Sequence, residues 1–247
     1  MKPLLRWITL ALLAGLALQL YFAARIALMA VADPQSTAFQ RSEALRLARS
    51  GDIGRWRQEW VPYTQLPNTL KRAVIASEDS GFANHDGVDW TAVEKAWQTN
   101  AAAQEQAEER AYRGSRRARA GNRPPRIRGG STITQQLAKN LFLSGERTML
   151  RKGQELVVTV LLETLLSKRR ILELYLNSVE WGEGIFGAEA AAQRYFRKPA
   201  ARLTAYEAAR LAVMLPRPKY FERLPQSAYV AGRARTIQAR IAAAEAP

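Results

Sequence analysis

The sequence predicts an all-α domain that follows a single N-terminal membrane helix, and three observations support this fold class. An uncharged apolar run of about 18 residues, Trp7 to Ala24, meets the lower length limit for a membrane span. After Pro67, apolar residues recur at spacings of three and four, which is the period of a helix. No stretch shows a convincing strand alternation or an internal repeat.

Size, charge and cysteine content narrow the classes of protein. The 247 residues suit an anchor plus one domain of roughly 180–190 residues. The absence of cysteine excludes disulfides and thiolate metal sites, and the single histidine argues against a His-ligated zinc site. A formal net charge of +15 predicts attraction to nucleic acid, acidic lipid or a phosphorylated substrate, and does not choose among them.

Residues 1–32 are predicted as a cytoplasmic tail and transmembrane anchor. Lys2 and Arg6 precede the apolar run, which favours an N-terminus on the inner side, and Arg25 can snorkel. A cleaved signal peptide with a small-x-small site at Ala30–Ala32 is the alternative, and a buried soluble helix is a third. The run is longer than the usual apolar region of a signal peptide, which favours the anchor.

Residues 33–60 are polar and mixed and are predicted as a stalk, and residues 61–247 as the domain. The first domain helix opens at Pro67-Asn68 and ends at two adjacent carboxylates, Glu78 and Asp79. Burying this helix would fix the backbone before Glu78 and leave its carboxylate desolvated and poised as a base. A solvated helix end is the alternative interpretation.

Asp89 is predicted to cap a helix that runs to about Tyr112, with Trp90, Val93 and Trp97 on one face. Residues 113–128 then hold seven arginines and no acid, with glycines and prolines that break a helix. This Arg-rich loop is either a solvated insertion or an anion-binding segment.

Two glycines lead into a helix start rich in hydroxyls and amides, from Ser131 to Asn140, where backbone N–H groups favour an anion. On the next helix Arg147, Arg151 and Glu155 share one face. An exposed, salt-bridged surface is the alternative for that face. The opposite face is predicted to be core and holds Leu150, Val157, Val160, Leu161 and Leu165.

The remaining chain is predicted as further helices around a Gly-rich loop, Val179 to Gly187. Ser167 caps the helix that ends at Asn177, and Thr204 and Glu207 form a capping box.

Four segments together resemble the monofunctional biosynthetic peptidoglycan glycosyltransferases, whose domain also occurs in class A penicillin-binding proteins. The segments are Glu78-Asp79-x-x-Phe82-x-x-His85-x-Gly87, Gly130-Ser131-Thr132-Ile133-Thr134-Gln135-Gln136-Leu137-x-Lys139-Asn140, Arg151-Lys152-x-x-Glu155 and Lys168-x-x-Ile171-Leu172-Glu173-x-Tyr175-Leu176-Asn177. The resemblance spans Leu66 to about Pro218 in the family's order, and the Arg-rich loop is longer than the family usually has. It implies a lysozyme-like, bilobal α fold with a cleft between a larger lobe and a smaller, membrane-facing one.

The resemblance also implies the chemistry. The growing glycan on undecaprenyl pyrophosphate would be transferred onto lipid II, with inversion. Glu78 would be the base, and Glu155 would assist near the leaving group or a divalent cation such as Mg or Mn, although the sequence requires no cofactor. The implied pyrophosphate- and substrate-binding set is Ser131, Thr132, Gln135, Gln136, Lys139, Asn140, Arg147, Arg151 and Lys152, and the supporting set is Asp79, Phe82, His85 and Asn177.

The expected partners are lipid II, the growing glycan, the membrane, and proteins of cell-wall synthesis and division, without nucleic acid. The expected location is the bacterial inner membrane, single-pass, with the domain on the periplasmic side. No Ser-x-x-Lys occurs and the chain ends at Pro247, so a transpeptidase activity is not expected.

Two other classes remain open on the residues alone. A lysozyme-like hydrolase would not need the clustered Arg and Lys residues. A basic scaffold that binds nucleic acid or acidic lipid would not need the Glu78–Asp79 pair. Polymerisation of labelled lipid II distinguishes the three classes.

Overall fold

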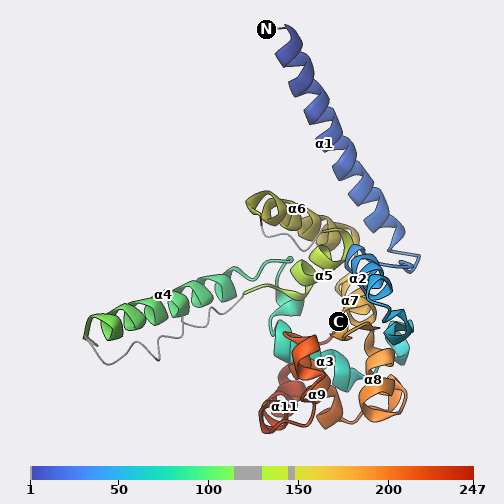
Figure 1. Ribbon diagram of the computed structural model, residues 1–247, viewed down its shortest axis with the longest axis vertical. Coiled ribbons are helices and arrows are strands. Elements are labelled where there is room, and N and C mark those ends of the chain that lie inside the picture. Colours follow the sequence, from blue (N-terminus) through green and yellow to red (C-terminus); the bar gives the residue numbers. More distant parts are fainter. Residues whose placement is uncertain (1, 114–129, 144–147) are drawn as a thin grey trace.

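The computed structural model describes residues 2–113, 130–143 and 148–247, and it is built almost entirely of helices (Figure 1). The helices are α1 (Lys2–Leu28), α2 (Ala38–Arg49), α3 (Asn68–Glu78), α4 (Trp90–Arg113), α5 (Ile133–Phe142), α6 (Met149–Leu165), α7 (Lys168–Ser178), α8 (Ala188–Phe196), α9 (Ala205–Met214), α10 (Pro218–Phe221) and α11 (Ala228–Arg240). The all-α prediction is confirmed. Arg147 and the Arg-rich loop beyond Arg113 lie outside the described residues.

A small sheet is a feature of the described fold that the sequence does not predict. Its strands are β1 (Arg57–Gln58), β2 (Glu180–Gly182) and β3 (Ile185–Phe186), in the order β1-β3-β2. β1 pairs parallel to β3, and β2 pairs antiparallel to it. Strands of two or three residues are too short to show a period of two in the sequence.

The segment predicted as a stalk is packed against the domain through α2 and β1. Leu47 of α2 is fully buried. The rings of Phe39 and Trp56 lie 6.0 and 4.8 Å from that of Phe186, measured between centroids. These contacts bring α2 to the edge of the pocket described below.

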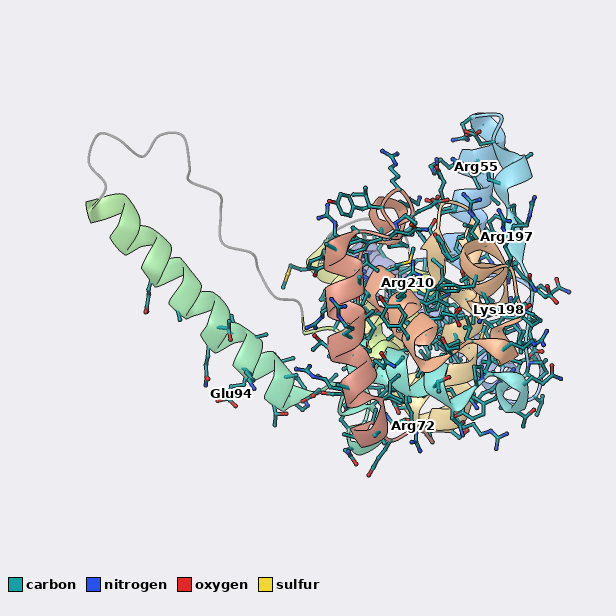
Figure 2. The ribbon with its side chains drawn as sticks, turned by 90° about the horizontal axis from the view of Figure 1, so that it is seen from below. Arg55, Arg72, Glu94, Arg197, Lys198 and Arg210 are labelled. Atoms are coloured by element: carbon teal, nitrogen blue, oxygen red, sulfur yellow. The ribbon has the colours of Figure 1, made fainter. Side chains whose placement is uncertain are left out.

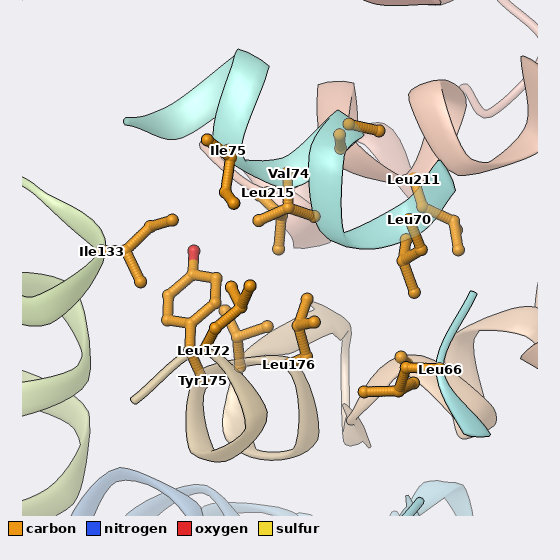
Figure 3. Close-up of a cluster of buried hydrophobic side chains, with 14 of the residues drawn as sticks. Leu66, Leu70, Val74, Ile75, Ile133, Leu172, Tyr175, Leu176, Leu211 and Leu215 are labelled. Atoms are coloured by element: carbon orange, nitrogen blue, oxygen red, sulfur yellow. The ribbon is translucent and has the colours of Figure 1, made fainter. Parts of the chain in front are cut away.

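The core forms where α3, α5, α7 and α9 meet (Figure 3). Val74 and Ile75 of α3 are fully buried there, as are Leu172 and Tyr175 of α7. The Tyr175 ring lies among these apolar side chains and its hydroxyl points out of the cluster toward the end of α3 (Figure 3). Packing at this point fixes the C-terminal end of α3, where Glu78 lies.

Helix α1 extends away from the domain (Figure 1) and is long and apolar enough to cross a membrane from Pro3 to Leu28, with a mean hydropathy of 1.8. Its last turns pack against the domain: Phe22 and Ile26 are buried, and the Phe22 ring lies 5.0 Å from that of Phe142. The Gln19 and Gln154 side-chain amides donate to each other at 2.9 and 3.0 Å, which joins α1 to α6.

The prediction that Leu150, Val157, Val160, Leu161 and Leu165 form a core face of α6 is wrong, because of these five only Leu161 packs, partly buried, against the core. Leu150 is 87% exposed and Val160 is 52% exposed, whereas Glu155, Val158 and Leu162 are buried. Helix α6 packs on α5 with its mixed face and on α1 at one side, so its most apolar face is left outward. An apolar stripe on a helix predicts burial in the protein core only where the stripe would otherwise be exposed to water.

Helix α4 projects from the body of the molecule (Figure 2). It begins as predicted, because the Asp89 carboxylate accepts the Ala92 N–H at 2.8 Å. Trp90 and Trp97 share a face, and they are 70% and 77% exposed.

Candidate active site

Glu78 is the last residue of α3, and its carboxylate is oriented by two neutral donors. Gln136 Nε2 donates to one oxygen at 3.2 Å and Ser77 Oγ to the other at 3.3 Å. Burial raises the pKa of Glu78; the two hydrogen bonds oppose this, Asp79 adds to it, and Arg233 opposes it. The predicted combination of a fixed helix end and a desolvated carboxylate is therefore present, and a raised pKa makes the carboxylate a stronger base.

Tyr175 fixes the amide that orients Glu78. Its hydroxyl donates to Gln136 Oε1 at 2.9 Å, which turns the Gln136 amide nitrogen toward Glu78. Burial, followed by the charges of Glu78 and Asp79, raises the pKa of Tyr175 well above 10.0, so the phenol remains a donor. In the sequence, Tyr175 stands out only as a member of the fourth family segment and has no predicted role, although a buried tyrosine hydroxyl requires a partner.

Asp79 ties the loop after α3 to the start of α5. One oxygen pairs with His85 Nε2 at 2.9 Å, and the other accepts the Ile133 N–H at 3.0 Å. Since the Gly87 N–H donates to His85 Nδ1 at 3.1 Å, the ring proton is on Nε2. Asp79 and His85 thus hold the segments that carry Glu78 and Gln136 in register.

Gly87 and Thr132 complete this junction. The Thr132 hydroxyl donates to Gly87 O at 2.6 Å, and Thr132 forms a capping box with Gln135 at the start of α5. Gly87 has a φ of +86°, and a Cβ there would lie 2.6 Å from Thr159 Cγ2, so a side chain does not fit.

A pocket of about 480 Å³ lies between α5 and α6, and we call it the α5–α6 pocket. It brings together eight predicted site residues, namely Ser131, Gln135, Gln136, Lys139, Asn140, Arg151, Lys152 and Glu155. Its apolar wall is formed by Phe39, Leu143, Val179, Leu215, Pro216 and Pro218.

Glu155 is 4% exposed and holds two cations at the wall of this pocket. Arg151 Nη1 lies 3.0 Å from one carboxylate oxygen, and Lys152 Nζ contacts the other. The face is therefore more than an exposed salt-bridged surface. Each oxygen of Glu155 already faces a cation, so a metal ion bound there would compete with Arg151 and Lys152.

The described residues contain no group of three His, Asp or Glu side chains that is able to hold a metal ion. Participation of Mg²⁺ or Mn²⁺ stays a prediction.

A second pocket of about 310 Å³, the Glu78 pocket, adjoins the first, and Ser131 lines both. Its charged lining consists of Glu78, Asp79, Asp89, Lys95, Arg233 and Arg240. Glu78 thus lies in the second pocket while its partner Gln136 lines the first. Glu78, the candidate base, therefore lies where the two pockets meet, and the two pockets are lined by different charged residues.

Phe82 and Asn177 lie away from both pockets. Phe82 is fully buried, with Lys168 Nζ 4.7 Å from its ring centroid. The Asn177 side chain accepts the Val61 N–H at 2.8 Å and donates to Val61 O at 2.9 Å. Both residues form part of the framework of the domain, and their supporting role in the reaction stays a prediction.

Four charged residues of these pockets were not singled out from the sequence: Lys95, Glu180, Arg233 and Arg240. Arg233 and Arg240 are seven positions apart on α11, which puts them on one face. They are far from Glu78 in the sequence, so no local sequence pattern predicts that they line the same pocket.

Comparisons with known proteins agree over most of the chain. Residues 46–242 match the family model described as Transglycosylase. The chain is 53% identical over 234 residues to a protein of Burkholderia pseudomallei named biosynthetic peptidoglycan transglycosylase, covering 95% of this chain and 84% of that protein. A protein of the same name from Burkholderia thailandensis is 52% identical over 246 residues, covering 98% of this chain and 88% of that protein.

Proposed function

Because the chain belongs to the transglycosylase family and is a peptidoglycan glycosyltransferase of cell-wall synthesis, we propose that it polymerises glycan strands from lipid II. The donor is the growing glycan on undecaprenyl pyrophosphate, and the acceptor is a sugar hydroxyl of lipid II. The hydroxyl oxygen bonds to the anomeric carbon of the donor. The bond from that carbon to the pyrophosphate oxygen breaks, the configuration inverts, and undecaprenyl pyrophosphate leaves with the bonding electrons.

The observation that carries the proposal is the position of Glu78 between the two pockets. In the proposed reaction the acceptor occupies the Glu78 pocket, and Glu78 takes the proton of the attacking hydroxyl. Gln136 and Ser77 hold the carboxylate by hydrogen bonds from its two sides. The electrostatic attraction of Arg233 opposes the rise in the pKa of Glu78, which favours the ionised form that acts as a base.

The α5–α6 pocket suits the leaving group. Negative charge grows on the pyrophosphate as its bond to carbon breaks, so cations already in place stabilise the transition state. Lys139, Arg151 and Lys152 supply the positive charge. Glu155 holds Arg151 and Lys152 in place. The N-terminus of α5 adds backbone N–H groups and a favourable dipole.

The membrane helix fits a lipid-linked substrate. With α1 as a single-pass anchor of the inner membrane, the domain would lie on the periplasmic side and meet lipid II at the membrane surface. We also propose that the product is not cross-linked, because the sequence contains no Ser-x-x-Lys nucleophile motif.

The test is polymerisation of labelled lipid II by the full-length protein and its Glu78→Gln variant. Glutamine preserves the shape and removes the base, so we expect a loss of at least about a hundredfold, the lower end for general-base catalysis, with lipid II binding retained. Glu59→Gln, which changes an exposed acid, is the control. Normal turnover in Glu78→Gln overturns the base assignment, and cleavage of finished glycan without polymerisation indicates a hydrolase instead.

A further inference from the structure

Glu180 is a buried carboxylate of the α5–α6 pocket that the proposed mechanism does not use. It comes from β2, whereas the cations of the pocket come from α5 and α6. Its side chain is 6% exposed, and its Oε1 has no hydrogen-bond partner. Lys219 Nζ lies 3.5 Å from that oxygen, but the same ammonium is 2.6 Å from Glu43.

Other buried carboxylates in the described part of the chain have full sets of partners. Asp79 has two, Glu155 has two cations, and Glu189 accepts from the Ala200 N–H at 2.7 Å and from Gln193 at 2.9 Å. An unsatisfied buried acceptor costs free energy, so native structures usually pair it. The exception at Glu180 faces a pocket, where a ligand is able to supply the missing donor.

A second unpaired atom in the same pocket has the opposite character. Arg151 Nε is a buried donor without a partner, although the terminal nitrogen of the same side chain binds Glu155. The pocket lining therefore holds a buried donor without a hydrogen bond, Arg151 Nε, and a buried acceptor on β2, Glu180 Oε1, whose printed contact is Lys219 Nζ at 3.5 Å. A ligand that satisfies both offers an anionic oxygen and an O–H or N–H donor, as a phosphorylated amido sugar does.

We propose that Glu180 is a substrate-binding residue that accepts a hydrogen bond from a hydroxyl or amide N–H of the phosphorylated donor sugar, whose phosphate meets Arg151. This inference rests on the proposed function and adds the residue that recognises the sugar. An acceptor at this position favours donors with a free hydroxyl or amide and disfavours analogues that lack one, because the analogue leaves Glu180 unpaired.

The test uses full-length protein and lipid II, with Glu180→Ala, Glu180→Gln and the control Glu183→Gln. Glu183 belongs to the same turn, but its carboxylate pairs with Arg46 and Arg55 at 2.8 and 2.5 Å. Loss of a hydrogen bond to a charged group should raise KM for lipid II roughly tenfold to a hundredfold in Glu180→Ala. The rise should be smaller in Glu180→Gln, whose amide oxygen still accepts, and absent in Glu183→Gln.

Binding measured without turnover separates this inference from the proposed function. Lipid II affinity is compared between Glu78→Gln and the Glu78→Gln/Glu180→Ala double variant, and the double variant should bind more weakly by the same factor. Unchanged KM and affinity in both Glu180 variants overturn the role of Glu180 while polymerisation by the wild type stands. Failure of the wild type to polymerise lipid II overturns the proposed function itself. If Glu180→Ala does not fold, the near-isosteric Glu180→Gln decides.

Discussion

At the scale of single residues, the burial of Glu180 makes protein stability depend on pH. Burial raises the pKa of Glu180 from 4.5 to about 7; Glu43 adds to this, and Lys219 and the Gly184 N–H oppose it. An acid whose pKa is higher in the folded state holds its proton more tightly there. Its contribution to the free energy of unfolding is therefore present below the unfolded pKa and is lost as pH rises through the folded value.

We expect Glu180→Gln to remove this dependence. Relative to the wild type, the variant should gain up to roughly 3 kcal/mol more at pH 8 than at pH 5, because each unit of pKa shift is worth about 1.4 kcal/mol. Urea unfolding at both pH values measures it. Glu183→Gln should show no such difference, since hydrogen bonds from Arg46 lower the pKa of Glu183 and place its titration in acid. An equal effect of Glu180→Gln at both pH values contradicts the prediction.

Arg151 is the residue that best separates a phosphate site from a salt-bridged surface. If Arg151 binds the departing pyrophosphate, Arg151→Ala should lower turnover roughly a hundredfold or more, the scale for removal of one transition-state donor. It should also cost about 1.5–3 kcal/mol of stability, because buried Glu155 loses a charged hydrogen bond.

Arg151→Lys isolates the catalytic part of that loss. The ammonium keeps the charge beside Glu155 but not the planar fork, so stability should be retained and turnover rescued only in part. Arg194→Lys, at an exposed pair with Glu222 at 3.5 Å, is the control for the same chemical change. Turnover and thermal midpoint are measured on the same proteins, and full activity in Arg151→Ala would return the phosphate role to Lys139 and Lys152.

At the scale of elements, the sequence predicted where helices begin better than it predicted which face of a helix is buried. Asp89, Ser167 and Thr204 cap their helices as expected, because a capping contact is local and its pattern is short. The site residues of α5 and α6 were predicted to act together, and the α5–α6 pocket joins them.

Long-range contacts account for what the sequence analysis missed. Glu180 enters the pocket on a three-residue strand, and Tyr175 reaches Glu78 only through Gln136. The outward apolar face of α6 was misassigned because its surroundings depend on α1, which the pattern within α6 does not encode. Spacing along a helix identifies a face but not the neighbour that covers it.

At the scale of the whole molecule, positive charge is spread over the body as well as gathered at the pockets. Arg55, Arg72, Arg197 and Arg210 lie on several sides of the domain (Figure 2). The net charge of +15 therefore favours a general attraction to anionic partners.

Helix α1 is part of the folded structure. Phe22, Ile26 and Met29 belong to the same buried cluster as the domain core, and Gln19 binds Gln154 on the helix that carries Arg151. Cleavage after Ala32 would remove these residues and expose Phe142, which packs on Phe22. Because cleavage would remove these contacts, we expect the helix to remain uncleaved.

We expect the mature protein to begin before Leu10 and to remain in the inner-membrane fraction after washing with high salt, because an apolar span does not depend on charge. Intact-mass measurement and fractionation test this. A truncated protein that starts at Asp33, compared in the same detergent, should have a lower thermal midpoint, since it loses the buried Phe22 and Ile26. A mature start at Asp33 together with an unchanged midpoint would establish the signal peptide instead and reduce the contact between α1 and α6 to an incidental one.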